Sequence, residues 1–284
     1  MKKIIFASLL SLISYNAYAN ETSNLQSKID NVKSNCSGIK SSLDKIFGLS
    51  VATTVSSGIG TLTSGSALAI GIVKAKNDYQ LSEETFNNDP ELFGSEFEKL
   101  VNDMKKSMEE KSKTLGNVRT GLMATATATS AISTGTSIGA TLTADKLADK
   151  MSNCNNAIRE LKIAKSSAEA EESEDTALIQ TASNILSSCK EYDRANIKQL
   201  KNMMTASSII SGIGTGVAGA GTVTSVMENK TKDKEKSKKL NTATNILAGI
   251  STGTSGTSSV LSAMSISRAK KDSDMAQNCE NTLN

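Results

Sequence analysis

Residues 241–267 read NTATNILAGISTGTSGTSSVLSAMSIS, a stretch without charged side chains in which Ser and Thr are the commonest residues. Ser, Thr and Gly are poor helix formers. A heptad-like stripe nevertheless runs through the stretch in steps of three and four: Leu240, Ala243, Leu247, Ile250, Thr254, Thr257, Leu261 and Met264. Strands alternate with a period of two and do not produce this spacing. The stretch therefore predicts a long helix of the coiled-coil type.

Three other uncharged segments resemble this one, at residues 47–73, 121–144 and 203–227. The tetrapeptide Gly-Ile-Gly-Thr occurs at 58–61 and again at 212–215, and residues 132–137 repeat unchanged at 250–255. Internal repeats of this kind indicate a structure built from one repeated unit. We interpret the four segments as two pairs that arose by duplication. Chance matches in a background rich in Ser, Thr and Gly are the alternative.

The four cysteines bracket the two pairs of repeats. Cys36 precedes Gly58 by 22 residues and Cys189 precedes Gly212 by 23, whereas Cys154 and Cys279 follow the second member of each pair. Four cysteines allow three pairings, and the duplication favours Cys36–Cys154 and Cys189–Cys279. Free structural thiols are the alternative. A zinc site would need all four thiols, because the chain has no histidine.

The second half of the chain is expected to fold into an antiparallel helical hairpin. The midpoint between Cys189 and Cys279 is Lys234, inside a polar run at 229–239 that suits a turn. Folding there brings Gly212 level with Gly256 and Gly219 level with Gly249, so that two helices can approach closely, as in a glycine zipper. The glycines expected to pack between helices are Gly58, Gly212, Gly216, Gly219, Gly249, Gly253 and Gly256.

Two other interpretations of the repeats stay open. If Gly-Ile-Gly-Thr marks a turn, eight short helices replace four long ones. The alternation of Ala and Thr at 124–129 also resembles a strand. The favoured fold is nevertheless all-α, with internally duplicated long antiparallel hairpins, interfaces of Gly, Ala, Ser and Thr, and one disulfide closing each half.

The expected organisation divides the chain at its cysteines. Residues 20–154 form a first hairpin half with its tip near 79–110, where Pro90 suits the first turn of a new helix. Residues 155–188 form a helical connector that includes the acidic run 169–175. Residues 189–284 form the second half, with the basic tip at 229–239.

The N-terminal residues have the pattern of a secretory signal peptide. Lys2 and Lys3 precede an apolar stretch at 4–13, and Ala17-Tyr18-Ala19 matches a cleavage site before Asn20. We expect residues 1–19 to be removed and the mature chain to be periplasmic or secreted, with or without association with a membrane. An uncleaved membrane anchor is the alternative.

Composition argues against catalysis and nucleic-acid binding. Without histidine, the commonest general base and metal ligand is absent. The Ser-x-x-Lys pairs at 37–40 and 42–45 lack accompanying catalytic motifs, and the carboxylate pairs lie in charged runs. Loss of Lys2 and Lys3 leaves 30 basic against 29 acidic residues, too balanced for coating nucleic acid. We expect no enzyme, no catalytic residue, no cofactor and no bound metal.

The two hairpin tips are the candidate contact sites. The first gathers four of the few aromatic residues, Tyr79, Phe86, Phe93 and Phe97, and the second gathers basic residues at Lys230, Lys232, Lys234, Lys236, Lys238 and Lys239. The aromatic residues suit either a local core or an apolar contact surface. The lysines suit either a solubilising turn or an acidic surface.

Two functions are consistent with these features. The first is an exported, non-enzymatic helical interaction or structural protein of the bacterial periplasm, envelope or exterior, with an unknown protein partner. The second is a membrane-inserting or pore-forming protein that uses its four uncharged segments, whose length suits a bilayer. A homo-oligomer with its hydroxyl groups turned towards water would make a pore. Lipid-dependent insertion would distinguish the second function from the first.

Overall fold

The computed structural model describes residues 24–83, 95–170 and 175–284, in which every regular element is a helix. The expected all-α fold is thus confirmed. Side chains of some residues between 79 and 110 lie outside the described part. The signal-peptide residues 1–19, Pro90, Phe86 and Phe93 also lie outside it, as do 171–174 of the acidic run.

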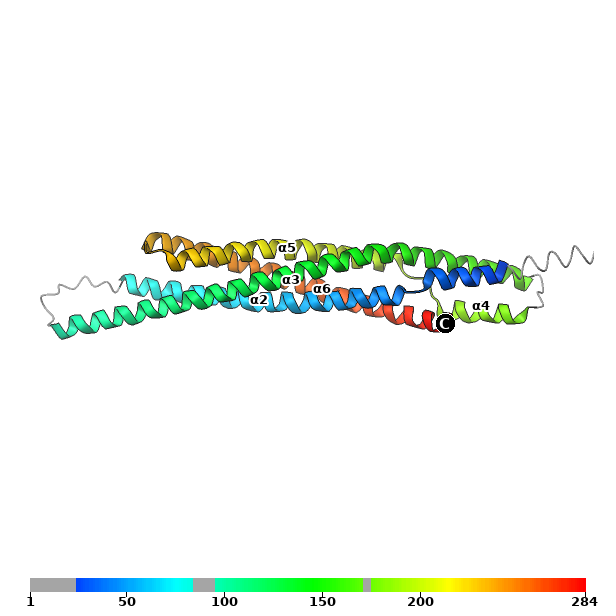
Figure 1. Ribbon diagram of the computed structural model, residues 1–284, viewed down its shortest axis with the longest axis horizontal. Coiled ribbons are helices and arrows are strands. Elements are labelled where there is room, and N and C mark those ends of the chain that lie inside the picture. The colour runs from blue at the N-terminus through cyan, green and yellow to red at the C-terminus, as the bar shows by residue number, and fades with distance from the viewer. Residues whose placement is uncertain (1–23, 84–94, 171–174) are drawn as a thin grey trace, which may run out of the picture. The chain divides into compact units, whose positions relative to one another are not determined.

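Four long helices and one short helix follow a helical stretch at residues 24–36 (Figure 1). The long ones are α2 (Ile39–Glu83), α3 (Ser95–Ala170), α5 (Arg194–Lys230) and α6 (Lys234–Leu283). The short helix α4 (Thr176–Ser188) begins where Asp175 accepts a hydrogen bond from the backbone N–H of Leu178. Gly38 separates 24–36 from α2 and has a φ of 70°, a left-handed conformation that favours glycine.

The helices run unbroken through the repeated motifs. Both copies of Gly-Ile-Gly-Thr lie inside helices, one in α2 and one in α5, and residues 124–129 lie inside α3. The interpretations of those motifs as turns and of 124–129 as a strand are therefore wrong. The second turn is shorter than the polar run 229–239, because α5 ends at Lys230 and α6 begins at Lys234.

The chain forms two compact units, each of which takes residues from both halves of the sequence. Of the described residues, unit 1 comprises those within 24–48, 140–202 and 265–284, and unit 2 comprises those within 49–139 and 203–264. All four long helices contribute residues to both units. The two units differ in what they bury.

Unit 1 has an apolar core. Its buried side chains are mainly aliphatic and include Leu25, Ile29, Val32, Ile39, Leu43, Ile46, Leu147, Met151, Leu161, Ile185 and Leu200. The side-chain amide of Asn155 donates to the backbone carbonyl of Tyr192 at 2.9 Å and accepts from the Tyr192 N–H at 2.8 Å. This pair of hydrogen bonds fixes the segment between α4 and α5 against α3.

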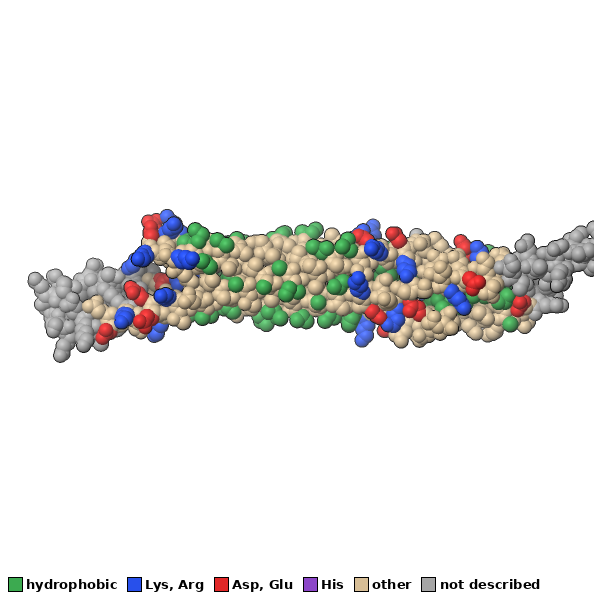
Figure 2. All heavy atoms as spheres, viewed as in Figure 1, with side chains coloured by type: hydrophobic (Ala, Val, Ile, Leu, Met, Phe, Trp, Pro, Cys, Tyr) green, Lys and Arg blue, Asp and Glu red, His purple; other side chains and the backbone are tan. Residues whose placement is uncertain are grey.

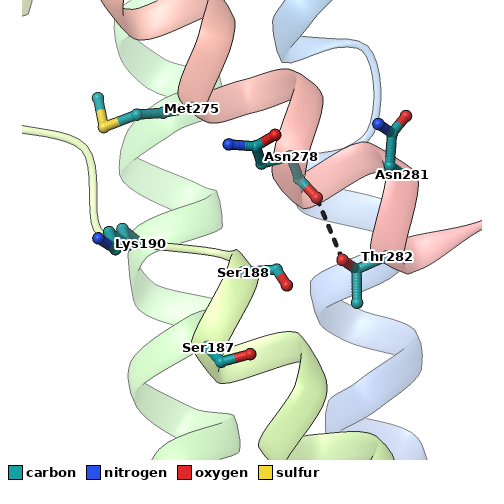
Figure 3. Close-up of a pocket in the computed structure, with 7 residues that line it drawn as sticks. All are labelled: Ser187, Ser188, Lys190, Met275, Asn278, Asn281 and Thr282. Atoms are coloured by element: carbon teal, nitrogen blue, oxygen red, sulfur yellow. Dashed lines mark hydrogen bonds between the residues drawn. The ribbon is translucent and has the colours of Figure 1, made fainter.

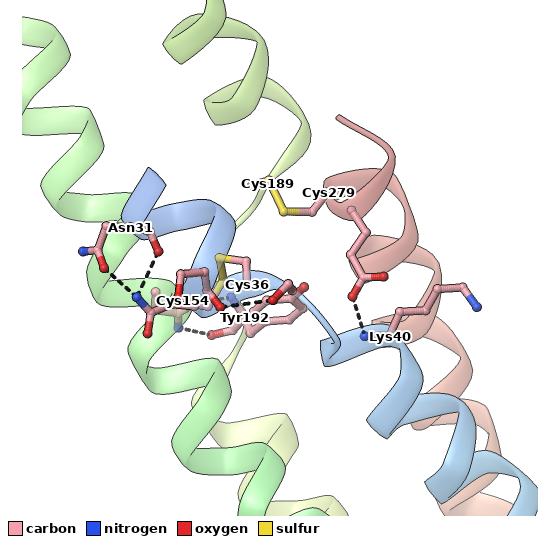
Figure 4. The surroundings of a disulfide bond; sticks show 12 residues. Asn31, Cys36, Lys40, Cys154, Cys189, Tyr192 and Cys279 are labelled. Carbon is pink, nitrogen blue, oxygen red and sulfur yellow. Dashed lines mark hydrogen bonds between the residues drawn. A yellow bond between two sulfur atoms is a disulfide. The ribbon is translucent and has the colours of Figure 1, made fainter. Parts of the chain in front are cut away.

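Both disulfides lie in unit 1 and join the residues that the cysteine spacing favours. Cys36 is bonded to Cys154 and Cys189 to Cys279, across sequence separations of 118 and 90 residues (Figure 4). All four cysteines belong to the apolar core. Each bond therefore ties together segments that only the folded chain brings close.

We expect Cys36→Ser/Cys154→Ser to lower the free energy of unfolding of the oxidised protein by about 4 kcal/mol, since a bond that closes so long a loop restricts the unfolded chain. Denaturant unfolding of both proteins, with and without reductant, measures the difference. A variant as stable as the oxidised parent would show that the bond contributes nothing.

Candidate functional site

Unit 2 is an antiparallel bundle of α2, α3, α5 and α6. Hydrogen bonds between neighbouring helices fix the order: Thr53 of α2 meets Thr136 of α3, and Thr134 of α3 meets Thr215 of α5. Thr224 of α5 then meets Thr244 of α6, and Thr252 of α6 meets Ser64 of α2. In every pair of neighbouring helices, residue numbers rise along one helix as they fall along the other, so the neighbours are antiparallel. This is the up-down-up-down arrangement of a four-helix bundle.

The interior of unit 2 consists of small and hydroxyl-bearing side chains. Of the Ile, Val and Leu residues that the structure describes in this unit, none is buried. The positions buried in the uncharged segments are instead Ser50, Thr53, Ser56, Ser57, Gly60, Ser64, Ala67, Gly71, Met123, Ala126, Ser130, Ser133, Ser137, Met204, Ser207, Ser211, Gly214, Ala218, Gly221, Ser225, Thr244, Ala248, Ser251, Ser255, Ser258 and Ser262, with Asn241. Four helices thus meet around a core of hydroxyl and methyl groups.

One serine from each helix contributes to a closed ring of hydrogen bonds. The oxygen of Ser57 lies 2.6 Å from that of Ser133, which lies 2.9 Å from Ser211. Ser211 lies 2.6 Å from Ser258, and Ser258 lies 3.3 Å from Ser57. None of these residues is more than 3% exposed. The name "serine ring" is used below for these four residues.

Further hydroxyl pairs continue this pattern along the bundle. Ser207 is bonded to both Ser258 and Ser262, and Thr120 of α3 is bonded to Ser225 of α5 at 2.7 Å. Many of the hydroxyls also donate to the carbonyl four residues earlier in their own helix, as Thr252 does to Ala248. Among the described side chains, the Oγ of Ser251 is the buried hydroxyl that has no partner.

The outer surface of unit 2 carries the aliphatic residues. Exposed large hydrophobic side chains occur on all four helices: Val55, Ile59, Leu62, Ile72, Val73, Val118, Ile132, Ile138, Ile209, Ile213, Val223, Met227, Ile246, Ile250, Val260 and Met264. The visible face in Figure 2 shows hydrophobic side chains over the helices of this unit. Residues 49–73, 120–144, 203–227 and 240–267 contain no charged residue, so no charge interrupts this surface. We call it the aliphatic belt.

The heptad-like stripe that identifies α6 in the sequence is not its buried face. Ile250, Thr257 and Met264 of that stripe are exposed. The buried stripe lies one residue away, at Asn241, Thr244, Ala248, Ser251, Ser255, Ser258 and Ser262. Both stripes have the same period, so the spacing identifies the helix but not its inward face.

The glycines at close contacts are also not those expected. A Cβ on Gly212 or Gly219 would meet Thr134 or Thr127 of α3 at 3.9 and 3.8 Å, ordinary contact distances, so neither glycine faces another glycine. Gly58, Gly249 and Gly256 likewise have room for a Cβ, and Gly216 and Gly253 have nothing within 4 Å. The close contacts occur at Gly60, Gly71, Gly116, Gly214 and Gly221. In each copy of Gly-Ile-Gly-Thr, therefore, the second glycine is the one that faces a close neighbour.

A buried cluster of charged residues lies where the uncharged segments end, near the α5–α6 turn. Glu228 of α5 binds Lys74 of α2 at 2.6 Å and Arg119 of α3 at 3.1 Å. Arg119 also donates to the side chains of Asn241 and Asn245 of α6, and Lys74 donates to Asp78 at 3.0 Å. The side chains of Arg119 and Glu228 are 0% and 1% exposed. All four helices are thus joined through one guanidinium and one carboxylate.

The electrostatics of this charged cluster depend on Glu228. Burial disfavours the charged form of Lys74, but hydrogen bonds and attraction from Glu228 and Asp78 outweigh it, so the pKa of Lys74 is raised. Burial lowers the pKa of Arg119, and the attraction of Glu228 partly offsets this effect. The sequence analysis missed these residues. Their positions gave a signal, because Lys74, Arg119 and Glu228 each directly border an uncharged segment.

The candidate contact residues at the two tips differ in what the structure describes. Tyr79 lies in α2 and Phe97 in α3, but their side chains, like Phe86 and Phe93, lie outside the described part. The lysines at 230, 232, 234, 236, 238 and 239 are all exposed at the α5–α6 turn. Lys239 pairs with Glu235 at 2.7 Å.

A pocket of about 480 Å³ lies in unit 1 beside the Cys189–Cys279 bond (Figure 3). Its lining consists of Ser187, Ser188, Lys190, Met275, Asn278, Asn281 and Thr282. These amide and hydroxyl groups could hold a polar molecule, but the lining contains no carboxylate to activate a hydroxyl. Within the described residues, no group of three His, Cys, Asp or Glu side chains could hold a metal ion.

We expect Gly71→Ala to destabilise the bundle by about 2 kcal/mol through overpacking. Its Cβ would overlap with Oδ1 of Asn245 and lie 2.7 Å from Cζ of Arg119. Gly253→Ala is the matched control: it adds a methyl group to an open helical position and should be neutral or slightly stabilising. Thermal unfolding followed by circular dichroism compares the two, and equal melting temperatures would contradict the close contact at Gly71.

Glu228→Gln should destabilise the protein by about 3–5 kcal/mol, because it leaves Lys74 and Arg119 buried with too little negative charge. Glu235→Gln removes a carboxylate whose side chain is 78% exposed and should change stability by at most about 0.5 kcal/mol. Denaturant unfolding curves test both variants. Similar small effects would mean that Glu228 does not hold the charged cluster together.

Comparison with known proteins gives no independent indication of function. The chain matches no protein-family model, no curated protein and no solved structure. What the protein does must therefore be argued from the placement of its own side chains. The most distinctive placement is the hydroxyl core of unit 2 beneath the aliphatic belt.

Proposed function

We propose that this chain is an exported, non-enzymatic protein that inserts unit 2 into a lipid bilayer, the second of the two functions suggested by its sequence. The observation that carries this proposal is the inverted placement of side chains in unit 2, with serines inside and aliphatic residues outside. Unit 1, with its aliphatic core and disulfides, has the composition of a domain that stays in water.

The inverted placement is unfavourable in water. Burying a Val, Leu or Ile side chain contributes about 1.5–3 kcal/mol to folding, and unit 2 leaves these side chains at its surface. Large exposed apolar patches on a soluble protein are typical of a contact surface. In water, a bundle of this length would be most stable with its isoleucines inside and its serines outside. Unit 2 does the opposite on all four helices.

In a bilayer the same placement is favourable. Lipid chains are as apolar as the core of a protein, so aliphatic side chains gain nothing by moving from lipid into the bundle. Helices in lipid therefore associate through close packing of small residues and through interhelical hydrogen bonds. The serine ring and the hydroxyl pairs around it provide both. A hydroxyl group that faces hydrocarbon without a hydrogen-bond partner costs free energy, and the interior position of these hydroxyls avoids that cost.

The dimensions of the uncharged segments match a membrane. A helix of about 25 residues is about 38 Å long, enough to cross a hydrocarbon core of about 30 Å. Each segment is bordered at both ends by charged residues, as Lys74 and Lys201 illustrate. Two helices contain 18-residue windows with a mean hydropathy of 1.3, and only 33% and 28% of these windows are buried. They are therefore unlike the buried core helices of soluble proteins.

The hydroxyl content indicates how insertion would occur. A single helix rich in Ser and Thr is only weakly hydrophobic, so the four helices are expected to enter lipid as a bundle that keeps its hydroxyls paired. The serine ring is closed, with its hydroxyls bonded to one another. Separation of the helices would expose a hydroxyl-lined path to water, which gives leakage as a direct readout.

The test uses the oxidised mature protein and phosphatidylcholine vesicles that contain a trapped dye. We expect the protein to sediment with the vesicles, to resist a high-salt wash and to release dye in a dose-dependent way. A monodisperse protein that remains in the supernatant without leakage would refute the proposal. Stable oligomers that ignore lipid would instead assign the aliphatic belt to contacts between copies.

A set of variants tests whether the aliphatic belt is responsible. Ile59→Gln, Ile132→Gln, Ile213→Gln and Ile250→Gln, combined, change one exposed isoleucine on each helix. We expect vesicle binding to fall at least about tenfold, because four apolar contacts with lipid are lost, while the helical content stays the same. Ile163→Gln, at a 68% exposed position of unit 1, should leave binding unchanged. Equal binding by all three proteins would refute a role for the belt.

A further inference from the structure

The α5–α6 turn concentrates positive charge on one short surface of unit 2. Residues 230–239 include six lysines against Asp233 and Glu235, and all eight of these charged residues are exposed. Lys230 ends α5, Lys232 lies in the three-residue link, and the other four lysines lie in the first turns of α6. An exposed excess of positive charge in so few residues indicates an acidic partner or a solvated turn.

Both acidic residues of the turn are already engaged within it. Asp233 accepts a hydrogen bond from the backbone N–H of Lys236 at 3.1 Å, which caps α6, and Glu235 pairs with Lys239. Among the described residues, no ion pair involves the other five lysines of the turn. Their charge is therefore available to an external anion.

The buried charged cluster around Glu228, which lies next to the turn, does not supply further negative charge to it. Glu228 is 1% exposed and is engaged by Lys74 and Arg119. Asn229 uses its amide to bind Thr120 at 3.1 Å. Lys74 and Arg119 are thus balanced by Glu228 and Asp78, and the α5–α6 turn itself keeps six lysines against two carboxylates.

The turn directly continues the aliphatic belt. Met227, 47% exposed, lies three residues before Lys230, and Ile246, 59% exposed, lies two helical turns after Lys239. An apolar surface that ends in lysines is the arrangement of helices at a membrane interface, where long basic side chains reach the headgroups while the apolar residues lie deeper. A nucleic acid would not require the adjoining aliphatic residues.

We propose that the α5–α6 turn binds the phosphate groups of anionic lipid headgroups. The lysines at 230, 232, 234, 236 and 238 supply the charge, and the adjoining belt residues enter the hydrocarbon. This inference rests on the proposed insertion of unit 2 and adds to it a lipid preference and a specific contact surface. It assigns the lysines a role beyond keeping the turn soluble.

The test compares vesicles of phosphatidylcholine alone with vesicles that also contain phosphatidylglycerol. The turn variant combines Lys232→Gln, Lys234→Gln, Lys236→Gln and Lys238→Gln. The control combines Lys33→Gln, Lys162→Gln, Lys198→Gln and Lys270→Gln, four exposed lysines of unit 1. Both sets remove the same charge, so a general effect of net charge would change both equally.

We expect the parent protein and the control to bind the anionic vesicles at least about tenfold more strongly than the neutral ones, given about 1 kcal/mol for each lysine near an anionic surface. The turn variant should bind both kinds of vesicle equally and still insert into them. Equal losses in the turn variant and the control, or a turn variant that keeps the preference, would overturn the headgroup site while leaving insertion intact. A parent protein that binds neither vesicle would overturn both proposals.

Discussion

The serine ring sets the distance between the helices of unit 2. Its oxygen atoms lie 2.6–2.9 Å apart across three of its four contacts, which requires four backbones to approach more closely than aliphatic side chains would allow. The levels above and below are filled mainly by Ser, Thr, Ala and Gly, with Met123 and Met204 as the two large apolar side chains that are fully buried. Among the described residues, no isoleucine, valine or leucine of unit 2 is fully buried. The aliphatic belt is therefore a consequence of the close interior.

The same helices follow the opposite rule in unit 1. Along α2, the buried face passes from Ile39, Leu43 and Ile46 to Ser50, Thr53 and Ser57 without a break in the helix or in the spacing. Only the chemistry of the inward positions changes. Unit 1 gains stability from apolar burial and two covalent bonds, whereas unit 2 depends on hydrogen bonds and close contact. This contrast supports the proposal that unit 2 enters lipid while unit 1 stays in water.

The sequence predicted the helices and the pairing of their cysteines, but not which face of each helix points inward. Spacing in steps of three and four identified α6 despite its many Ser and Thr residues. The fold about Lys234 also agrees with the contacts of Thr224 with Thr244 and Ser211 with Ser258. Periodicity cannot distinguish two stripes that lie one residue apart. Gly212 and Gly219 were expected to pack between helices because the fold about Lys234 brings them level with Gly256 and Gly249, whereas the close contacts occur at Gly214 and Gly221.

The arrangement of chain segments in unit 1 also bears on the order in which the fold can be completed. Cys36 and Cys154 are separated by 118 positions in the sequence, and Cys189 and Cys279 by 90. Because residues 265–284 belong to unit 1 and α6 completes unit 2, neither unit can reach its final packing before the last helix has been synthesised. Until then, Cys189 and the hydroxyl-bearing residues that contact α6 lack the partners that α6 supplies.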